Sequence, residues 1–322
     1  MTKTLKFTWA KRLAGAAVVA AGLASPAAAF VDGCPSEPIM AGFAEFGKTG
    51  KMPPELGKWL GNVEAQRIEP FKPFDNVDYV GICWVSAWLV HTDEGTVLID
   101  TLYGPFMDKL VADIESTGTA LEDIKYVLMT HGHFDHVGGA AYLKDKLPNA
   151  KFVMSEGGWT EFLEAAEASK GTRRELRGIE KDVVMKDGET LEFGGNSFTM
   201  IETPGHTWGT SSYMYNVQDG ENTHRAITIG GLGLNAIEGP TQVEAYIESV
   251  DRVAALIAEA GENVEVHLTT HGFSNNLEET RALLEARGAG EPNPFIAPDA
   301  ILKQVAGLRA GAVARLAIEN EK

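Results

Sequence analysis

The chain has 322 residues, of which 44% are hydrophobic and 23% charged, a composition that is ordinary for a soluble globular protein. It carries 28 basic and 45 acidic residues, which gives a formal net charge of −17. Because nucleic acids and anionic membrane surfaces are bound by basic patches, this balance argues against both as partners.

The first 29 residues have the pattern of a secretory signal peptide. Four basic residues lie within the first twelve positions, an apolar stretch covers residues 13–24, and residues 27–29 are all alanine. The apolar stretch is shorter than the roughly 20 residues of a membrane-spanning helix. We therefore expect cleavage near Ala29, a periplasmic or secreted protein, and no membrane insertion after cleavage.

The segment that follows contains Cys34, and the second cysteine is Cys83. In an exported protein the two can pair and tie the start of the mature chain to a strand, but the sequence does not give their separation, so a disulfide is left open. Residues 30–75 are rich in Pro, Gly and aromatic residues without clear periodicity, which predicts an irregular lead segment. No linker interrupts residues 30–322, so we expect a single domain there.

Strands and helices are predicted to alternate in the first part of this domain. Two β-rich runs separated by the turn at 92–95 predict a hairpin, and amphipathic spacing predicts the first helix. Residues 157–178 are expected to form a loop. The predicted elements are strands at 77–91 and 96–100, a helix at 105–117, a strand at 124–130, a helix at 140–147 and a strand at 151–155.

The second part of the domain repeats the order of strands first and helices after. Asp-Gly and Gly-Gly turns predict hairpins, and the covered, apolar strands favour an α/β fold. The predicted elements are short strands within 182–206, 210–217 and 224–231, a helix at 241–260, a strand at 264–272, and helices at 276–287 and 298–317.

Three histidines and an aspartate lie within six positions after the strand at 124–130. His131 and His133 are two apart, so in an extended segment both project to the same side and can hold one ion. Asp135 and His136 are adjacent and can serve a second ion beside the first. Imidazole nitrogen and carboxylate oxygen are ligands that zinc accepts. The spacing therefore predicts a two-metal site.

Each of these ions needs a further ligand from elsewhere in the chain. His206 follows a strand in a Pro-Gly turn, and His271 follows the last strand. Both lie where loops leave sheet ends, and such loops often carry catalytic groups. The first predicted ligand group is thus His131, His133 and His206, and the second is Asp135, His136 and His271. The remaining strand histidines, His91, His224 and His267, are interpreted as hydrogen-bonded or packed residues.

The stretch HGHFDH at 131–136 resembles the H-x-H-x-D-H signature of the metallo-β-lactamase superfamily, and TPGHT at 203–207 with the late strand-end histidine completes the pattern. The resemblance extends from about Tyr79 to the C-terminus. It implies a four-layer αβ/βα sandwich with the metals at one edge between the two sheets. It also implies two zinc ions per chain and hydrolysis by a metal-bound hydroxide that Asp135 orients.

One difference from many members of the superfamily narrows the resemblance to a single subclass. Many hydrolases of this superfamily carry a bridging aspartate after the third histidine, and some metallo-β-lactamases carry a cysteine there. This chain has Gly230, Gly231 and Gly233 in that stretch. The pattern is therefore most similar to subclass B3, which implies opening of β-lactam rings in the periplasm.

Substrate contacts are less well defined by the sequence. Subclass B3 enzymes commonly present serines after this strand, whereas this chain has Asn235, which is a candidate replacement. Trp208 and Phe273 each lie two residues past a ligand histidine and are candidates to wall the cleft, with core packing as the alternative. A small-molecule substrate is expected. A lactone or another ester or amide is the alternative substrate, an iron-dependent redox enzyme is a further alternative, and the oligomeric state is left open.

Overall fold

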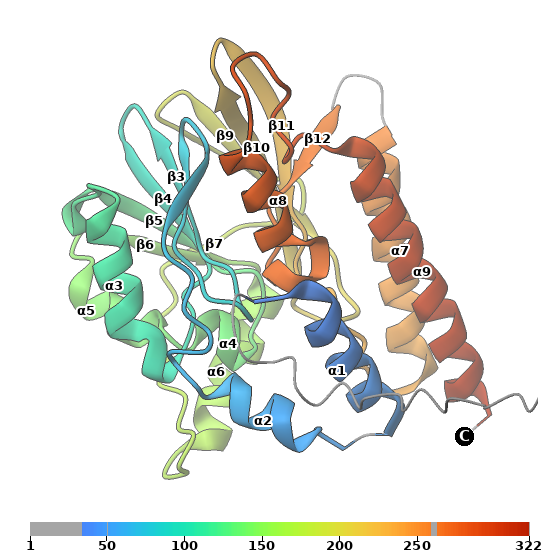
Figure 1. Cartoon of the computed structure of the whole chain (residues 1–322). Coiled ribbons are helices and arrows are strands. Elements are labelled where there is room, and N and C mark those ends of the chain that lie inside the picture. Colours follow the sequence, from blue (N-terminus) through green and yellow to red (C-terminus); the bar gives the residue numbers. More distant parts are fainter. Residues whose placement is uncertain (1–33, 50, 259–262, 322) are drawn as a thin grey trace, which may run out of the picture.

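The computed structural model describes residues 34–49, 51–258 and 263–321, so the predicted signal peptide lies outside the described residues. The described chain forms an α/β sandwich in which two β-sheets face each other and helices lie on the outer side of each sheet (Figure 1). This arrangement confirms the predicted fold class.

Within the described residues the first sheet has seven strands in the order β1-β2-β3-β4-β5-β6-β7. Neighbours from β1 to β4 are antiparallel and those from β4 to β7 are parallel. The predicted hairpin is confirmed, because Thr92 pairs with Gly95. The strands are β1 Phe71–Phe74, β2 Val77–Tyr79, β3 Trp88–Thr92, β4 Gly95–Ile99, β5 Ile124–Leu128, β6 Lys151–Met154 and β7 Val183–Val184.

The second sheet, counted over the same residues, has five strands in the order β12-β11-β10-β9-β8. β11 and β12 are parallel, and the other neighbours are antiparallel. The strands are β8 Thr190–Phe193, β9 Asn196–Glu202, β10 Ser211–Asp219, β11 Asn222–Thr228 and β12 Val264–His267.

Helices cover the outer face of each sheet. α3 (Met107–Ser116), α5 (Ala140–Lys146) and α6 (Glu156–Ser169) pack on the first sheet, and α7 (Gly239–Ala258) and α9 (Pro298–Asn320) pack on the second. The other helices are α1 Ser36–Thr49, α2 Pro54–Leu60, α4 Phe134–Val137 and α8 Leu277–Glu285, with short 3-10 turns at Gly104–Phe106, Leu121–Asp123 and Gly272–Asn275.

Side-chain alternation along the strands builds the layers. In β4, Val97 points into the core between the sheets, whereas Leu98 points toward the helices on the outer face. In β10, Tyr213 and Tyr215 enter the central core, and Met214 faces the α7 side. Because successive strand residues point to opposite faces, an almost wholly apolar strand can supply two cores at once.

The prediction of an irregular lead segment at 30–75 is wrong. This part of the chain forms α1, α2 and β1, and it buries Ile39, Leu56 and Trp59 in the central core. Burial against the sandwich stabilises two short helices whose sequences are weakly periodic. Cys34 and Cys83 form a disulfide with a Cα–Cα distance of 5.4 Å, which fixes the start of the described chain to the segment between β2 and β3.

Two further predictions also differ from the structure. The run 77–91 is not one strand, because residues 80–87 leave the sheet between β2 and β3. Gly81 makes the bend there, since a Cβ at this position would lie 2.6 Å from the Tyr79 hydroxyl and from the Ala87 nitrogen. The predicted loop at 157–178 begins as helix α6, which buries Trp159 and Phe162 against the first sheet.

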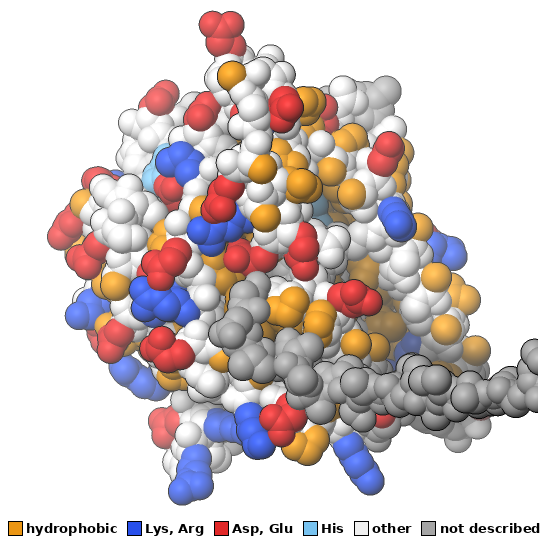
Figure 2. All heavy atoms as spheres, viewed as in Figure 1, with side chains coloured by type: hydrophobic (Ala, Val, Ile, Leu, Met, Phe, Trp, Pro, Cys, Tyr) orange, Lys and Arg blue, Asp and Glu red, His pale blue; other side chains and the backbone are white. Residues whose placement is uncertain are grey.

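The surface is mixed in charge on the face that Figure 2 displays. Lys and Arg side chains are interspersed with Asp and Glu side chains on this face, rather than gathered into a basic patch. No described helix is long and apolar enough to cross a membrane.

Candidate metal centre

The six predicted ligands meet at one edge of the sandwich, although they come from three distant parts of the chain. β5 ends at Leu128, and the chain then delivers His131 and His133 before α4 begins and turns Asp135 and His136 inward. The other two ligands are His206, in the loop between β9 and β10, and His271, four residues past the end of β12. They form two compact groups, His131–His133–His206 and Asp135–His136–His271, in each of which the ligand atoms lie within 4.8 Å of one another.

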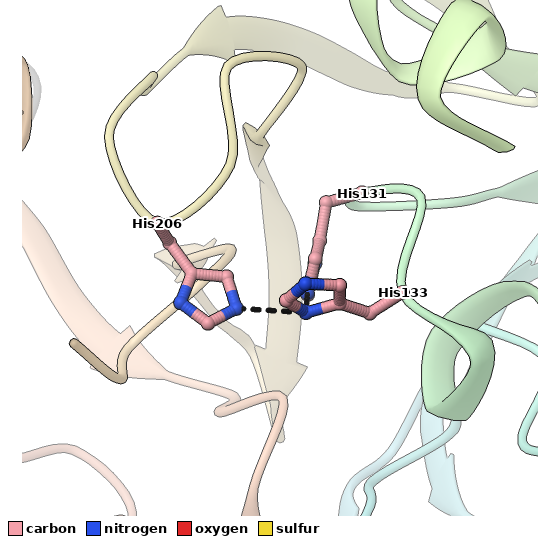
Figure 3. Close-up of side chains that lie close together, drawn as sticks. All are labelled: His131, His133 and His206. Carbon is pink, nitrogen blue, oxygen red and sulfur yellow. Dashed lines mark hydrogen bonds between the residues drawn. The ribbon is translucent and has the colours of Figure 1, made fainter. Parts of the chain in front are cut away.

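The three-histidine group points its ring nitrogens at a common centre. Nδ1 of His133 lies 3.1 Å from Nε2 of His131 and 3.0 Å from Nε2 of His206 (Figure 3). His131 and His206 are buried, while His133 is partly exposed. Three imidazole nitrogens that converge in this way have the spacing and the donor type of a zinc site.

The second group is equally compact and contains the one carboxylate of the two groups among the described residues. Oδ2 of Asp135 lies 3.3 Å from Nε2 of His136 and 3.8 Å from Nε2 of His271. Nε2 of His136 is fully buried and has no partner of hydrogen-bond geometry among the described residues. A buried polar atom without a partner is costly, and coordination of a metal ion would satisfy it. The residues therefore fit a metal ion.

The two groups lie side by side. The ring centroids of His131 and His136, one from each group, are 4.2 Å apart, and those of His136 and His271 are 5.0 Å apart. Two ions held by these groups would be neighbours, as the sequence predicted.

Hydrogen bonds on the far side of the rings fix their orientation. Nδ1 of His136 lies 2.7 Å from Oδ2 of Asp100. Nδ1 of His206 lies 2.6 Å from the carbonyl oxygen of Gly233, and Nδ1 of His271 lies 2.7 Å from that of Trp84. Because Nδ1 donates outward, Nε2 of each ring faces the centre and is the atom that can coordinate a metal ion once it is free of a proton.

Burial and the neighbouring histidines keep most of these rings neutral. They lower the pKa of His131 well below its ordinary value, and burial with the nearby rings lowers the pKa of His206 to about 3. Burial, together with the charge of His136, lowers the pKa of His271 to about 4. Neutral imidazole is the form that binds a metal, so these three rings need not lose a proton at pH 7.

Asp135 and His136 behave as a charged pair. Burial alone would raise the pKa of Asp135, but the positive charge of His136 overcomes this and lowers it well below the ordinary value. Burial alone would lower the pKa of His136, but Asp135 and Asp100 together raise it to about 10. The two carboxylates thus favour positive charge at this position, which a metal ion also supplies.

The backbone near His206 leaves no room for a bridging carboxylate side chain at Gly230 or Gly231. Gly231 has φ +64°, and a Cβ there would clash with the His206 side chain. A side chain at Gly230 is excluded as well, because its Cβ would clash with the Ser211 carbonyl oxygen. The glycines seen in the sequence are therefore needed to bring the backbone close to the three-histidine group.

The candidate substrate contacts lie in different environments. The Trp208 side chain is 57% exposed, and Asn235 is also exposed. Phe273 is only 9% exposed, because its ring stacks on Phe43 at 5.0 Å. Phe134, between two ligands, is 50% exposed and was not singled out from the sequence.

The other strand histidines lie outside both groups. His91 contacts Asp78 at 2.6 Å, His224 contacts Glu265 at 2.7 Å, and Nδ1 of His267 lies 2.9 Å from Oε1 of Gln304. These contacts agree with their interpretation as hydrogen-bonded or packed residues.

Two residues around the centre were missed from the sequence. Asp100 directly follows an apolar strand, as the His131 segment does, and that strand-end position was a usable signal. Glu161 lies within α6 and contacts the loop after His206, and no sequence pattern marks it.

Comparison with known proteins agrees with this geometry. Residues 80–218 match the metallo-beta-lactamase superfamily. BJP-1, a subclass B3 metallo-beta-lactamase of Bradyrhizobium japonicum, superposes with a TM-score of 0.69 at 25% identity, over 80% of this chain and 96% of that one. A mutant metallo-beta-lactamase from Cronobacter sakazakii gives a TM-score of 0.69 at 27% identity, over 80% of this chain and 100% of that one.

Curated relatives are more varied. A hydroxyacylglutathione hydrolase of Acidiphilium cryptum is 31% identical over 129 residues, which is 40% of this chain and 44% of that protein. A coenzyme F420H(2) oxidase of Methanothermobacter marburgensis is 30% identical over 139 residues, which is 42% of this chain and 32% of that protein. The chain thus spans less than half the length of these two relatives. Residues 80–218 thus match a metallo-beta-lactamase superfamily domain, and the fold of the described chain is similar to that of solved subclass B3 enzymes.

Proposed function

We propose that the chain is an exported, dinuclear zinc hydrolase that opens the β-lactam ring. The observation that carries this proposal is the pair of adjacent ligand groups, three histidines beside Asp-His-His, with glycine where a bridging carboxylate would stand. Similarity to subclass B3 structures supports the substrate class. The disulfide supports export, since such bonds persist in oxidising compartments.

The six ligand residues have different roles in the proposed hydrolysis. When bound, two zinc ions supply Lewis acidity to a carbonyl oxygen and to a water molecule. His131, His133 and His206 would hold the first ion, and Asp135, His136 and His271 the second. The positive charge of the second ion would keep Asp135 ionised, so its carboxylate can accept a hydrogen bond from the attacking water and orient it.

A second candidate is hydrolysis of a lactone or another ester with an apolar acyl group. The exposed rings of Phe134 and Trp208 favour it, because each lies beside a metal ligand and offers an apolar surface to a substrate. Phe134 is held edge-on against Tyr103, with ring centroids 5.2 Å apart, and tilted against Trp84 at 5.9 Å. The similarity to a hydroxyacylglutathione hydrolase is in keeping with a substrate other than a β-lactam.

One experiment distinguishes β-lactam hydrolysis from hydrolysis of a lactone or another ester. The purified protein is analysed for metal and then assayed with a chromogenic cephalosporin beside a panel of lactones and thioesters. We expect two zinc ions per chain and cephalosporin turnover that is lost with a chelator. Turnover of lactones alone would replace the β-lactam proposal with the second candidate. Iron in place of zinc, with no hydrolysis of either class, would point to redox chemistry and overturn both.

A further inference from the structure

Glu161 of α6 clamps the loop that carries His206. Its Oε2 accepts a hydrogen bond from the Thr207 hydroxyl at 2.6 Å, and its Oε1 accepts one from the Gly209 backbone N–H at 2.8 Å. Both carboxylate oxygens are therefore engaged by two of the three residues that follow His206. Trp208, exposed beside the site, lies between the two anchored residues.

The same turn of α6 also contacts the other ligand segment. Gly132 lies between His131 and His133, and a Cβ at Gly132 would lie 2.7 Å from Cβ of Glu161 and 2.8 Å from the nitrogen of Phe162. No side chain fits there, so the His131–His133 segment rests directly on the α6 backbone at Glu161. One residue thus touches both parts of the chain that build the three-histidine group.

The first turn of α6 reinforces this contact. The hydroxyl of Ser155, the residue that caps the helix, donates to the Gly209 carbonyl oxygen at 3.2 Å and accepts from the Gly158 N–H. Gly209 in turn packs closely on Gly157, since a Cβ at Gly209 would lie 2.4 Å from the carbonyl carbon of Gly157. Two positions of one helix, Ser155 at its start and Glu161 in its second turn, therefore hold the loop after His206.

The second ligand group is positioned by different residues. Asp100 fixes His136, and the Trp84 carbonyl oxygen fixes His271. Within the described residues, the hydrogen bonds of the Glu161 carboxylate go to Thr207 and Gly209 and not to Asp135, His136 or His271. The second group is therefore held by residues other than Glu161.

From these contacts we propose that Glu161 is a positioning residue for the three-histidine group, and that it sets the metal affinity of this group without setting that of the Asp135 group. This inference rests on the proposed function, because it assumes that both groups bind metal. Glu161 itself supplies no metal ligand, and it lies on α6 and not in one of the segments that carry the ligands.

The test compares metal binding by the full chain and by matched variants. Glu161→Ala removes both hydrogen bonds, and Glu161→Gln keeps an oxygen for Gly209 and presents an NH2 group to the Thr207 hydroxyl. Glu164→Ala is the control, because Glu164 is an exposed glutamate one turn further along α6. Zinc affinity is measured by calorimetry with a competing chelator, Co²⁺ substitution reports each site by its absorption spectrum, and thermal unfolding of the metal-free protein reports folding.

We expect Glu161→Ala to weaken one of two classes of site by about 10–100-fold, the range typical for residues that orient metal ligands. The weakened site should be the one whose Co²⁺ spectrum is that of an all-nitrogen ligand set. Glu161→Gln should restore most of the affinity, and Glu164→Ala should match the wild type. If Glu161→Ala does not fold, Thr207→Val removes the Oε2 partner and the Thr207–Thr210 hydroxyl contact but keeps the Gly209 bond to Oε1, and it should give a smaller loss at the same site.

Several results would overturn the inference. Unchanged affinity at both sites in Glu161→Ala would show that the clamp does not act on His206. Equal weakening of both sites would show that Glu161 supports the fold in general and not one group. A wild-type chain that binds no metal at all would instead defeat the proposed function itself, and the two failures are therefore distinguishable.

Discussion

Oδ2 of Asp100 lies 2.7 Å from Nδ1 of His136, and both side chains are buried. The Asp100 carboxylate also accepts hydrogen bonds from the backbone N–H of Thr130 at 2.8 Å and from its hydroxyl. It follows β4 directly, so it links the end of that strand to the segment that enters His131. A single buried carboxylate therefore joins the end of β4 to the segment after β5 that carries four of the ligands.

Replacing this carboxylate should weaken the second ligand group. Asp100 has φ +60°, and Asn tolerates this left-handed conformation, so Asp100→Asn keeps the backbone while it removes the charge. We expect a loss of metal affinity of about 10–100-fold at the Asp135 group, as is typical for partners that orient ligating histidines. Competition with a chelator measures the loss. An affinity equal to that of the wild type would contradict the role given to Asp100.

His133→Ala should abolish hydrolysis and leave a folded protein. The side chain is only partly exposed to solvent yet supplies the nitrogen that faces both His131 and His206, so its loss opens the three-histidine group. Metal content and turnover are measured together. His224→Ala is the matched control, because His224 contacts Glu265 outside the centre and its removal should not change turnover. Full activity of His133→Ala would show that the group is not the catalytic one.

Gly231→Ala should disturb the same group from the backbone side. The added Cβ would clash with the His206 side chain, and φ +64° is unfavourable for alanine. We expect reduced zinc content and a lower melting temperature than in the wild type. Gly220→Ala, also at positive φ but with open space around the added Cβ, separates backbone strain from the clash. Equal effects of both substitutions would mean that contact with His206 is unimportant.

Reduction of the disulfide should destabilise the protein. Cys34 and Cys83 are 49 residues apart, and closing a loop of this length stabilises a folded protein by roughly 4 kcal/mol in the chain-entropy account. We expect a lower melting temperature with a reductant. The double variant Cys34→Ala, Cys83→Ala should melt near the reduced wild type and should not respond to the reductant. A wild-type melting temperature that is insensitive to reduction would contradict this assignment.

Stability should fall in mild acid because of His267. Burial lowers its pKa to about 4 in the folded chain, partly offset by the hydrogen bond to Gln304, whereas an unfolded histidine titrates near 6.5. The unfolded state therefore binds a proton first. The contribution of neutral His267 is fully present above pH 6.5 and is lost as the pH falls toward 4, at up to about 1.4 kcal/mol per pH unit.

The matched variant is His267→Asn, whose amide can donate toward Gln304 without titrating. Denaturant unfolding between pH 4 and 7.5 gives the free energy of unfolding of both proteins. We expect a shallower acid slope in the variant than in the wild type. Parallel slopes would mean that His267 is not protonated preferentially in the unfolded chain.

Much of the centre could be read from local sequence. His131, His133, Asp135 and His136 are close in space because they are close along the chain, and the apolar strand before them ends where they begin. His206 and His271 could be added because polar residues at strand ends collect at one edge of a sheet. The α/β alternation also follows from local patterns of hydrophobic residues.

Other features were decided only when the chain folded. The two helices of the lead segment exist because Leu56 and Trp59 find a core to enter, and short helices are not stable without such burial. Asp100 and Glu161 act through partners 36 and 46 or more positions away, which no local pattern encodes. Spacing along the chain thus specifies which side chains can bind metal, whereas the packing of sheets and helices specifies which groups hold them in place, because those contacts arise only from tertiary structure.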